Sequence, residues 1–199
     1  FDHVGFRHDA RANGLEDVSF FAAPGTTTAL VGPSGAGKDM LMALACAADP
    51  GIRAARRVIT RPAEAGGEDF DGVTEAEFAR RLAASEFALH WRAHGLGYGI
   101  PAAELAGVGT VLMNLSRAVL AKAVAHLPGL TVLLVTAPPQ VLAARLAGRA
   151  RETAADQARR LDRAGFALPD GIPFRTVLND GTPEQGLARF LDALQPVRA

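Results

Sequence analysis

The chain has 199 residues, of which 49% are hydrophobic and 21% are charged. This length suffices for one α/β domain with a buried core, and this composition excludes a disordered chain. Basic residues and acidic residues number 21 each, so the formal net charge is zero. No overall positive field therefore points to a nucleic-acid partner.

Cysteine content and hydropathy indicate the cellular compartment in which the protein works. Cys46 is the only cysteine, so an internal disulfide is excluded and a reducing compartment such as the cytoplasm is expected. No apolar run is long enough to span a membrane, and no signal peptide is evident. The chain begins with Phe1 rather than Met, so we expect the native N-terminus to lie elsewhere. No pattern indicates an oligomeric state.

Strand-like and helix-like segments alternate along the chain. Alternating apolar residues in 4–6 and 18–20 predict a β hairpin near the start. The polar, glycine-rich stretch 63–72 is predicted to be a loop. Further strands are predicted at 27–31, 57–60, 87–91, 109–114, 130–136 and 174–178. This alternation predicts an α/β fold in which helices cover a mostly parallel sheet.

Capping residues mark the starts of three later helices. Thr74 begins a capping box, and Ser116 can cap a second helix. Thr182 is followed by Pro183 in the first helical turn and by Gln185 at the third helical position. We therefore expect helices after each of these three positions.

The junction between strand 27–31 and a helix predicted over 39–44 carries the phosphate-binding pattern G-x-x-x-x-G-K-[S/T] at every fixed position but the last. Glycines let the backbone curl around a phosphate chain, Lys38 reaches the β- and γ-phosphates, and the helix N-terminus adds positive charge. The residues predicted to bind a nucleoside triphosphate are Gly32, Pro33, Ser34, Gly35, Ala36, Gly37, Lys38 and Asp39. The alternative is a glycine-rich turn without a ligand.

Position 39 departs from the pattern, which expects a hydroxyl that ligates Mg²⁺. Asp39 supplies a carboxylate instead, which can also ligate Mg²⁺. No apolar run ends in an acid that could be a second ligand, because 109–114 ends in Asn114 and 130–136 ends in Thr136. Asp39 is therefore the predicted metal ligand. No general base is evident, which suits an acceptor that is itself an ionised phosphate.

Arginines gather in one later region. Arg145 and Arg149 are four residues apart and would share a helix face, so a solvated helical surface is one interpretation. Beside a phosphate loop, arginines on a closing lid would stabilise the transferring phosphoryl group. We therefore expect at least one of Arg149, Arg151 and Arg160 to contact phosphate. The cluster consists of Arg145, Arg149, Arg151, Arg159, Arg160 and Arg163.

A family resemblance extends from about residue 27 to 194. It rests on stretches 32–39, 58–61, 89–91 with 95–99, 111–117, 148–152 and 178–181. Together these resemble guanylate kinase-like P-loop kinases, and within them the ribose 1,5-bisphosphate phosphokinases of bacterial phosphonate breakdown, in which Asp follows the loop lysine. Guanylate kinases proper are less similar. They have a hydroxyl at position 39, a second base-pocket arginine where this chain has Ala63 or Glu64, and an acid near Asn114.

The resemblance implies a three-layer P-loop kinase fold with a small substrate-binding insertion and an arginine-rich lid at about 145–163. It also implies the reaction. ATP, with Mg²⁺, would phosphorylate a small sugar phosphate, ribose 1,5-bisphosphate, on its 1-phosphate. The products would be ADP and 5-phosphoribosyl 1-diphosphate (PRPP).

The resemblance further assigns roles to single residues. Lys38, Arg149 and Arg160 would act in catalysis, the two arginines from the lid. Asn179 and Asp180 would lie near the adenine of ATP.

The sugar bisphosphate would be faced by Arg61, Tyr98 and Arg117, although Tyr98 could instead be a packing residue of the core. Packing is also the expected role of Trp91. His90 and His94 lack a metal-ligand spacing, and we expect them at the surface or in supporting roles.

The first residues resemble a different family. Stretches 1–6, 14–20 and 24–32 look like the start of an ABC transporter ATPase, in which two antiparallel strands precede the phosphate loop and an aromatic near Phe6 or His8 stacks on adenine. Past residue 50 this resemblance ends, because no Leu-Ser-Gly-Gly-Gln signature follows. We therefore divide the chain into an ABC-like β extension, 1–26, and a P-loop kinase domain, 27–199. The alternatives are a guanylate-type nucleoside monophosphate kinase, an ABC-type ATPase fragment and an inactive fusion product.

Overall fold

A five-stranded sheet forms the centre of the computed structural model, which describes residues 4–7, 14–18, 25–62, 69–147 and 167–195. Its strand order is β11-β10-β3-β9-β4, and every neighbouring pair is parallel. The strands are β3 (Thr27–Val31), β4 (Ile52–Ala54), β9 (Thr110–Asn114), β10 (Thr131–Thr136) and β11 (Arg175–Leu178). The predicted parallel sheet is therefore confirmed.

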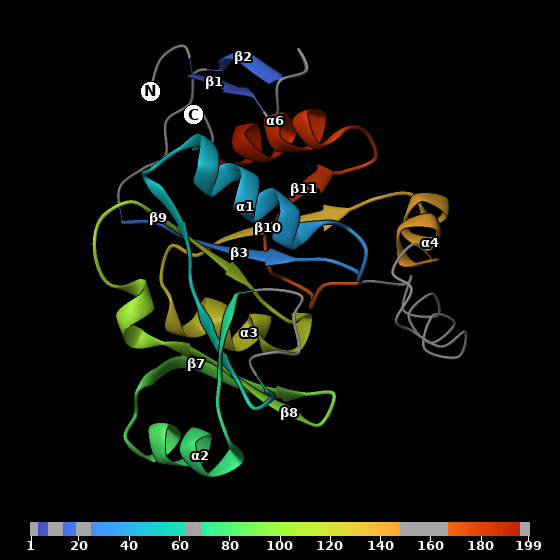
Figure 1. The fold of residues 1–199 in the computed structure, drawn as a ribbon. Coiled ribbons are helices and arrows are strands. Elements are labelled where there is room, and N and C mark those ends of the chain that lie inside the picture. The colour runs from blue at the N-terminus through green and yellow to red at the C-terminus, as the bar shows by residue number, and fades with distance from the viewer. Residues whose placement is uncertain (1–3, 8–13, 19–24, 63–68, 148–166, 196–199) are drawn as a thin grey trace.

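Helices cover both faces of this sheet (Figure 1). α1 (Lys38–Ala48) and α6 (Pro183–Leu194) lie on one face, and α3 (Arg117–His126) lies on the other. Successive residues of a strand point to opposite faces, so Leu30 packs in the α1 and α6 core while Ala29 and Val31 pack in the α3 core. α4 (Pro139–Ala147) follows β10 and adds Leu142 to the first core. The predicted three-layer architecture is thus confirmed.

A second, four-stranded sheet is inserted in the chain between β4 and β9, and its strand order is β6-β5-β8-β7. The strands are β5 (Arg57–Ile59), β6 (Phe70–Gly72), β7 (Phe87–Ala93) and β8 (Leu96–Pro101). α2 (Glu75–Ala83) packs on this sheet through Phe78, whose ring stacks on Phe87 with 4.9 Å between centroids. Leu89 and Ile100 join the α3 core. η2 (Ala102–Leu105) leads back to the central sheet.

The predicted N-terminal hairpin is present. β1 (Val4–Arg7) and β2 (Gly14–Val18) pair antiparallel, with Phe6 opposite Leu15. β1 lies near α1 and β2 lies near α6, at the top of the view in Figure 1. The likeness of this segment to an ABC ATPase, and the division of the chain at residue 26, stay predictions.

The structure corrects the prediction for the inserted sheet. The loop predicted over 63–72 ends too late, because Phe70–Gly72 pairs in parallel with β5 and forms β6. Residues 63–68 lie outside the described part of the chain. β4 and β8 are strands that the sequence pattern did not indicate.

The three predicted helix caps are confirmed at their N-cap residues. The side chains of Thr74, Ser116 and Thr182 each accept a hydrogen bond from a backbone N–H in the first turn of α2, α3 and α6. The reciprocal capping box forms only at Thr182, where the Gln185 side chain accepts from the Thr182 N–H at 3.2 Å. At Thr74 only the threonine half forms, because the Glu77 carboxylate bonds to arginines.

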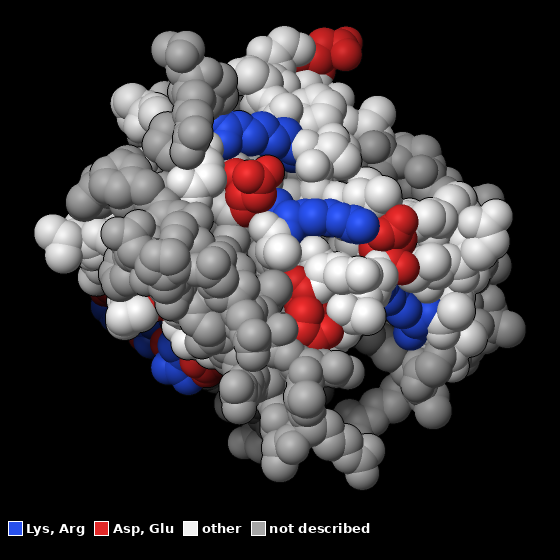
Figure 2. Space-filling model, turned by 90° about the horizontal axis from the view of Figure 1, so that it is seen from above, with Lys and Arg blue, Asp and Glu red and all other residues white. Residues whose placement is uncertain are grey.

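Two surface properties agree with the composition. Among the described residues, every helix is too short or too polar to cross a bilayer. Figure 2 shows acidic and basic side chains interspersed on the face seen from above, rather than gathered into one field. On that face, the acidic and basic residues that give a net charge of zero are therefore distributed among one another.

Candidate active site

The phosphate-binding pattern forms a loop between the end of β3 and the start of α1. Lys38 folds back over this loop, and its Nζ donates to the carbonyl oxygens of Gly32 at 2.9 Å and Pro33 at 3.3 Å. Gly37 is the N-cap of α1 with a φ of 88°, and α1 has no side-chain cap. The N–H groups of the first helical turn are therefore not occupied by a side-chain cap and are available to a phosphate.

The glycine at position 37 is required by its neighbour as well as by its backbone angle. A Cβ atom built there would lie 2.5 Å from Nδ2 of Asn179. A left-handed φ also disfavours any residue with a side chain. The loop therefore owes its shape to a close contact with the turn between β11 and α6.

Asn179 holds the phosphate loop through a buried hydrogen bond. Its side chain is fully buried, and its Nδ2 donates to the Ala36 carbonyl oxygen at 2.8 Å. Its Oδ1 is buried between the loop and α6, near the position that a Cβ of Gly186 would occupy. In the described structure, Oδ1 receives no hydrogen bond. The predicted place of Asn179 near the adenine is untested, and what the structure gives is this contact with Ala36.

Arg145 holds the same region from α4. Its Nη1 donates to the Asn179 carbonyl oxygen at 2.9 Å and, more weakly, to the Gly35 carbonyl oxygen at 3.4 Å. The sequence placed Arg145 in the lid cluster and gave no signal of this contact, because the partners are 110 and 34 residues away. The sequence thus named Arg145 in the arginine cluster but did not reveal its contacts with the phosphate loop and Asn179.

Asp39, the predicted metal ligand, is exposed in the first turn of α1. Its Oδ1 accepts a hydrogen bond from Nδ2 of Asn114 at 2.6 Å. Asn114 ends β9, which pairs with β3 so that Asn114 lies opposite Leu30. The P-loop helix and the neighbouring strand therefore meet at this carboxylate.

The residues present fit a magnesium ion that arrives with a nucleotide. Within the described ranges, no group of three or more His, Cys, Asp or Glu side chains gathers at one place. Mg²⁺ is commonly held by one or two carboxylates together with substrate phosphates and water, rather than by a cage of protein ligands. Asp39 beside the phosphate loop meets that requirement.

Aromatic and basic side chains line the inserted sheet on the side of β9. Tyr98 stacks on Trp91 with 5.3 Å between ring centroids and 8° between planes. The guanidinium of Arg57 lies 5.7 Å from the centroid of the Tyr98 ring, and its Nη1 donates to the Asn114 carbonyl oxygen at 2.9 Å. Arg57, which the sequence did not single out, therefore connects Tyr98 with the strand that carries Asn114.

Two further residues predicted to face the substrate lie at this end of the molecule. Arg61 follows β5, and its guanidinium lies 4.2 Å from the centroid of the Phe70 ring on β6. Arg117 begins α3, three positions after Asn114. Arg61 and Tyr98 thus come from the inserted sheet, and Arg117 comes from the connection after β9.

The chain is 51% identical over 181 residues to the ribose 1,5-bisphosphate phosphokinase PhnN of a Ruegeria species, an alignment that covers 89% of this chain and 95% of that protein. The chain belongs to the ribose 1,5-bisphosphate phosphokinase family. It is also 50% identical to the bifunctional ribose 1,5-bisphosphokinase-thymidine phosphorylase of Cupriavidus necator, over 87% of this chain and 30% of that longer protein. No family model matches the chain.

Solved structures agree on the fold of this ribose 1,5-bisphosphate phosphokinase family member. The guanylate kinase of Anaplasma phagocytophilum superimposes with a TM-score of 0.56, at 18% identity, over 88% of this chain and 87% of that one. The guanylate kinase-like fold expected from the sequence is therefore confirmed. Relatives named as ribose 1,5-bisphosphate phosphokinases disfavour the guanylate-type and ABC-type alternatives.

The lid arginines expected to contact phosphate, Arg149, Arg151 and Arg160, lie outside the described part of the chain, as do Arg159 and Arg163 of the same cluster. Also outside it are His8 of the ABC-like segment and Ala63 and Glu64, which stand where guanylate kinases have a second base-pocket arginine. Their roles stay predictions. Asp180, expected near the adenine, is described, and Nη1 of Arg189 lies 2.6 Å from its Oδ1, which lowers the pKa of the Asp180 carboxyl.

His90 contacts a lysine of α3. Its Nε2 lies 3.2 Å from Nζ of Lys122 on α3, so the neutral ring can accept a hydrogen bond from the ammonium. Burial and the Lys122 charge both lower the pKa of His90. His90 therefore helps join the inserted sheet to α3 while uncharged.

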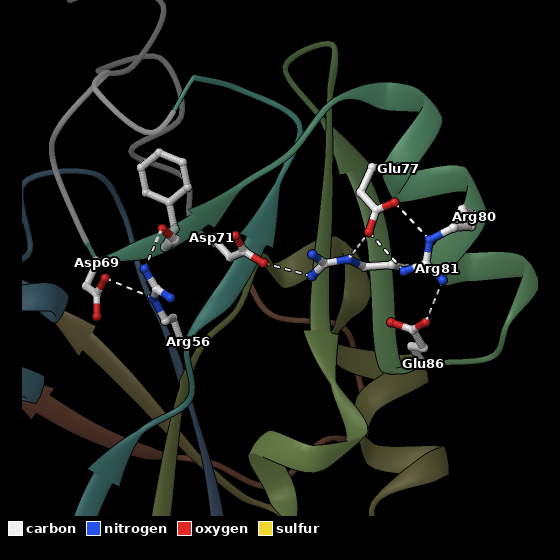
Figure 3. Close-up of polar contacts among 8 residues, drawn as sticks. Arg56, Asp69, Asp71, Glu77, Arg80, Arg81 and Glu86 are labelled. Carbon is white, nitrogen blue, oxygen red and sulfur yellow. Dashed lines mark hydrogen bonds and ion pairs between the residues drawn. The ribbon is translucent and has the colours of Figure 1, made fainter.

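An ion-pair chain fixes α2 to the inserted sheet (Figure 3). Glu77 accepts hydrogen bonds from Arg80 at 2.8 Å and from Arg81 at 2.7 Å. Arg81 also bonds to Asp71 on β6 at 2.7 Å, and Arg80 bonds to Glu86 at 3.0 Å. These arginines lower the pKa of Glu77 to about 2. These ion pairs connect α2 with β6 and with Glu86, which precedes β7.

Proposed function

We propose that this chain transfers the γ-phosphoryl group of ATP to the 1-phosphate of ribose 1,5-bisphosphate, giving PRPP and ADP. A phosphate oxygen of the acceptor forms the new bond to the γ-phosphorus, and the bond from that phosphorus to the β–γ bridging oxygen breaks. The observation that carries this proposal is the phosphate loop followed by the exposed carboxylate of Asp39, in a chain with this family membership.

The nucleotide side of the reaction rests on the loop. Lys38 would exchange its bonds to the Gly32 and Pro33 carbonyl oxygens for the β- and γ-phosphates. Asp39 would hold Mg²⁺, and the bound ion would neutralise charge that develops between the two phosphates. Asn179, which also bonds to the Ala36 carbonyl oxygen, and Asp180 would lie near the adenine.

The acceptor side rests on the inserted sheet and the start of α3. Arg61 and Arg117 would bind the two phosphates of the sugar, and Tyr98 would contact its ring. The acceptor oxygen is ionised at pH 7, so this chemistry requires no general base. Arg149 and Arg160 would supply positive charge to the transferring group from the lid.

We also propose that the protein works in the cytoplasm. ATP as the phosphoryl donor and a free Cys46 suit the cytoplasm, and PRPP formed here would recover the ribose released in phosphonate breakdown. Cys46 is partly buried, which raises the pKa of its thiol, so a packing role is proposed for it rather than a reactive one.

The test is an acceptor comparison with purified protein and Mg·ATP. Ribose 1,5-bisphosphate, GMP and no acceptor are supplied in parallel, and ADP and PRPP are followed. PRPP in the first tube alone supports the proposal, and Lys38→Ala should abolish it. ADP formed only with GMP would replace the proposal with a nucleotide kinase. ADP formed equally without acceptor would favour an ATPase.

A further inference from the structure

Asn114 lies where three parts of the molecule meet. Its side-chain Nδ2 donates to Oδ1 of Asp39 at 2.6 Å, which ties the end of β9 to the first turn of α1. Its backbone oxygen accepts from Nη1 of Arg57 at 2.9 Å, which ties the same residue to the inserted sheet. The next residue, Leu115, donates its N–H to the Leu30 carbonyl oxygen at 3.0 Å, beside the phosphate loop.

The chemistry of an amide at this place differs from that of an acid. The Asn114 N–H holds one oxygen of the Asp39 carboxylate in a charge-assisted hydrogen bond. It adds no formal charge, so the carboxylate keeps its negative charge for a cation. Across the described residues, no hydrogen bond reaches the other oxygen, Oδ2. One oxygen is thus fixed by protein, and the second can be offered to a metal ion.

We propose that Asn114 is a positioning residue that aims the Asp39 carboxylate at the cation of Mg·ATP. The inference deepens the proposed function and rests on its assignment of ATP and Mg²⁺ to this site. The Arg57 bond extends the same contact to Tyr98, so Asn114 connects the cation side of the site with the acceptor side.

The proposal separates two substitutions that are similar in size. Asn114→Leu removes the donor and leaves Asp39 free to rotate, so the cation should bind less tightly in the nucleotide complex. Asn114→Asp places a second carboxylate against the first, and two carboxylates in contact repel unless they share a proton or a cation. This variant should therefore bind a divalent cation even when no nucleotide is present.

Mn²⁺ is the probe, because its electron paramagnetic resonance signal reports binding without catalysis. We titrate Mn²⁺ into the full chain with and without a non-hydrolysable ATP analogue. For Asn114→Leu we expect the Mn²⁺ Kd in the analogue complex to rise about tenfold, the change expected for one charge-assisted hydrogen bond. For Asn114→Asp we expect Mn²⁺ binding without the analogue. Gln140→Glu, the same amide-to-acid exchange at an exposed position on α4, should match the wild type.

Activity supplies a second readout that loss of folding cannot imitate. The kcat of Asn114→Leu should recover as Mg²⁺ is raised, while the KM for ribose 1,5-bisphosphate stays near that of the wild type. Unchanged Mn²⁺ affinity in Asn114→Leu, or an Asn114→Asp variant that still needs the analogue to bind Mn²⁺, would overturn the proposal. Failure of the wild type to form PRPP would instead overturn the proposed reaction, and the Mn²⁺ titrations would still report on Asn114.

Discussion

Lys38 and Asp39 are consecutive residues that carry opposite charges at the same phosphate loop. Lys38 is satisfied within the loop by the Gly32 and Pro33 carbonyl oxygens, whereas Asp39 is exposed and held only by Asn114 among the described residues. A lysine that is already positioned over the loop loses little side-chain freedom when phosphate displaces the carbonyls. The loop is therefore organised for its ligand by bonds that the ligand replaces.

Alanine substitution at these two positions should separate catalysis from folding. Asp39→Ala should lower kcat by about a hundredfold or more, because a metal-held charge at the transferring group is lost. Lys38→Ala should be at least as damaging. The measurements are steady-state kinetics and thermal unfolding. If Asp39→Ala had nearly wild-type kcat, Asp39 would be only a helix N-terminal charge worth about 0.3–1 kcal/mol.

Arg145 should matter for nucleotide affinity through the carbonyl oxygens that it holds beside the phosphate loop. Arg145→Ala removes the bonds to the Asn179 and Gly35 carbonyl oxygens, so we expect the Kd for ATP to rise about tenfold, the equivalent of about 1.4 kcal/mol. Calorimetric titration with ATP measures this.

Arg53 offers a matched control for that experiment. Arg53 lies on β4, and its guanidinium also donates to two carbonyl oxygens, those of Glu104 at 2.6 Å and Ala106 at 2.5 Å. Arg53→Ala should lower the melting temperature without changing the Kd for ATP. Equal losses of ATP affinity in both variants would show that Arg145 contributes only general stability.

Secondary elements differ in how far the sequence determines them. The strands of the central sheet other than β4 are apolar runs between clear turn or cap signals, so their positions are predicted to within a residue or two. β4 and β6 have three residues each, and β8 contains two glycines, so none has a pattern of its own. They become strands because β9, β5 and β7 provide partners, which is information from tertiary structure.

The ion pairs of α2 predict a measurable titration. Arg80 and Arg81 lower the pKa of Glu77 to about 2, so its contribution to stability is complete above the ordinary carboxyl pKa of 4.5 and is lost as the pH falls from there toward 2. In Arg80→Gln/Arg81→Gln, carboxyl NMR should give a Glu77 pKa close to 4.5. A pKa that stayed near 2 in the double variant would assign the shift to another cause.

On the scale of the molecule, the candidate site was only partly visible in the sequence. The phosphate loop is formed by eight consecutive residues, 32–39, so its sequence pattern was enough to predict it. The contacts of Arg145, Asn114 and Arg57 join residues that are 34 to 110 positions apart in the sequence. They are made by guanidinium and amide groups, which many surface residues also have. No single-sequence pattern encodes such pairs, because the fold alone brings them together.

The division of the chain at residue 26 also predicts an outcome for the whole molecule. Among the residues whose burial the structure describes, which begin at Gly25, both cores consist of residues from Ala29 onward, and the Gly25 N–H bonds to the Gly109 carbonyl oxygen. A chain that starts at Pro24 should therefore fold, form PRPP and lose about 2–4 °C in melting temperature, the equivalent of about 1 kcal/mol. Kinetics and calorimetry against the full chain test this. Loss of ATP binding would instead make the hairpin part of the nucleotide site.

Among the described residues, those of the inserted sheet that face α3 share the hydrophobic core of the central domain and form no separate one. Leu89 and Ile100 are fully buried in the same cluster as Met113 and Leu120, which belong to the central domain. A chimera that exchanges this sheet for that of another kinase must therefore match those contacts, or it will open a cavity between the two parts. Under the proposed function, we therefore expect acceptor specificity to change more readily by substitution of Arg61 or Tyr98 than by exchange of the whole inserted sheet.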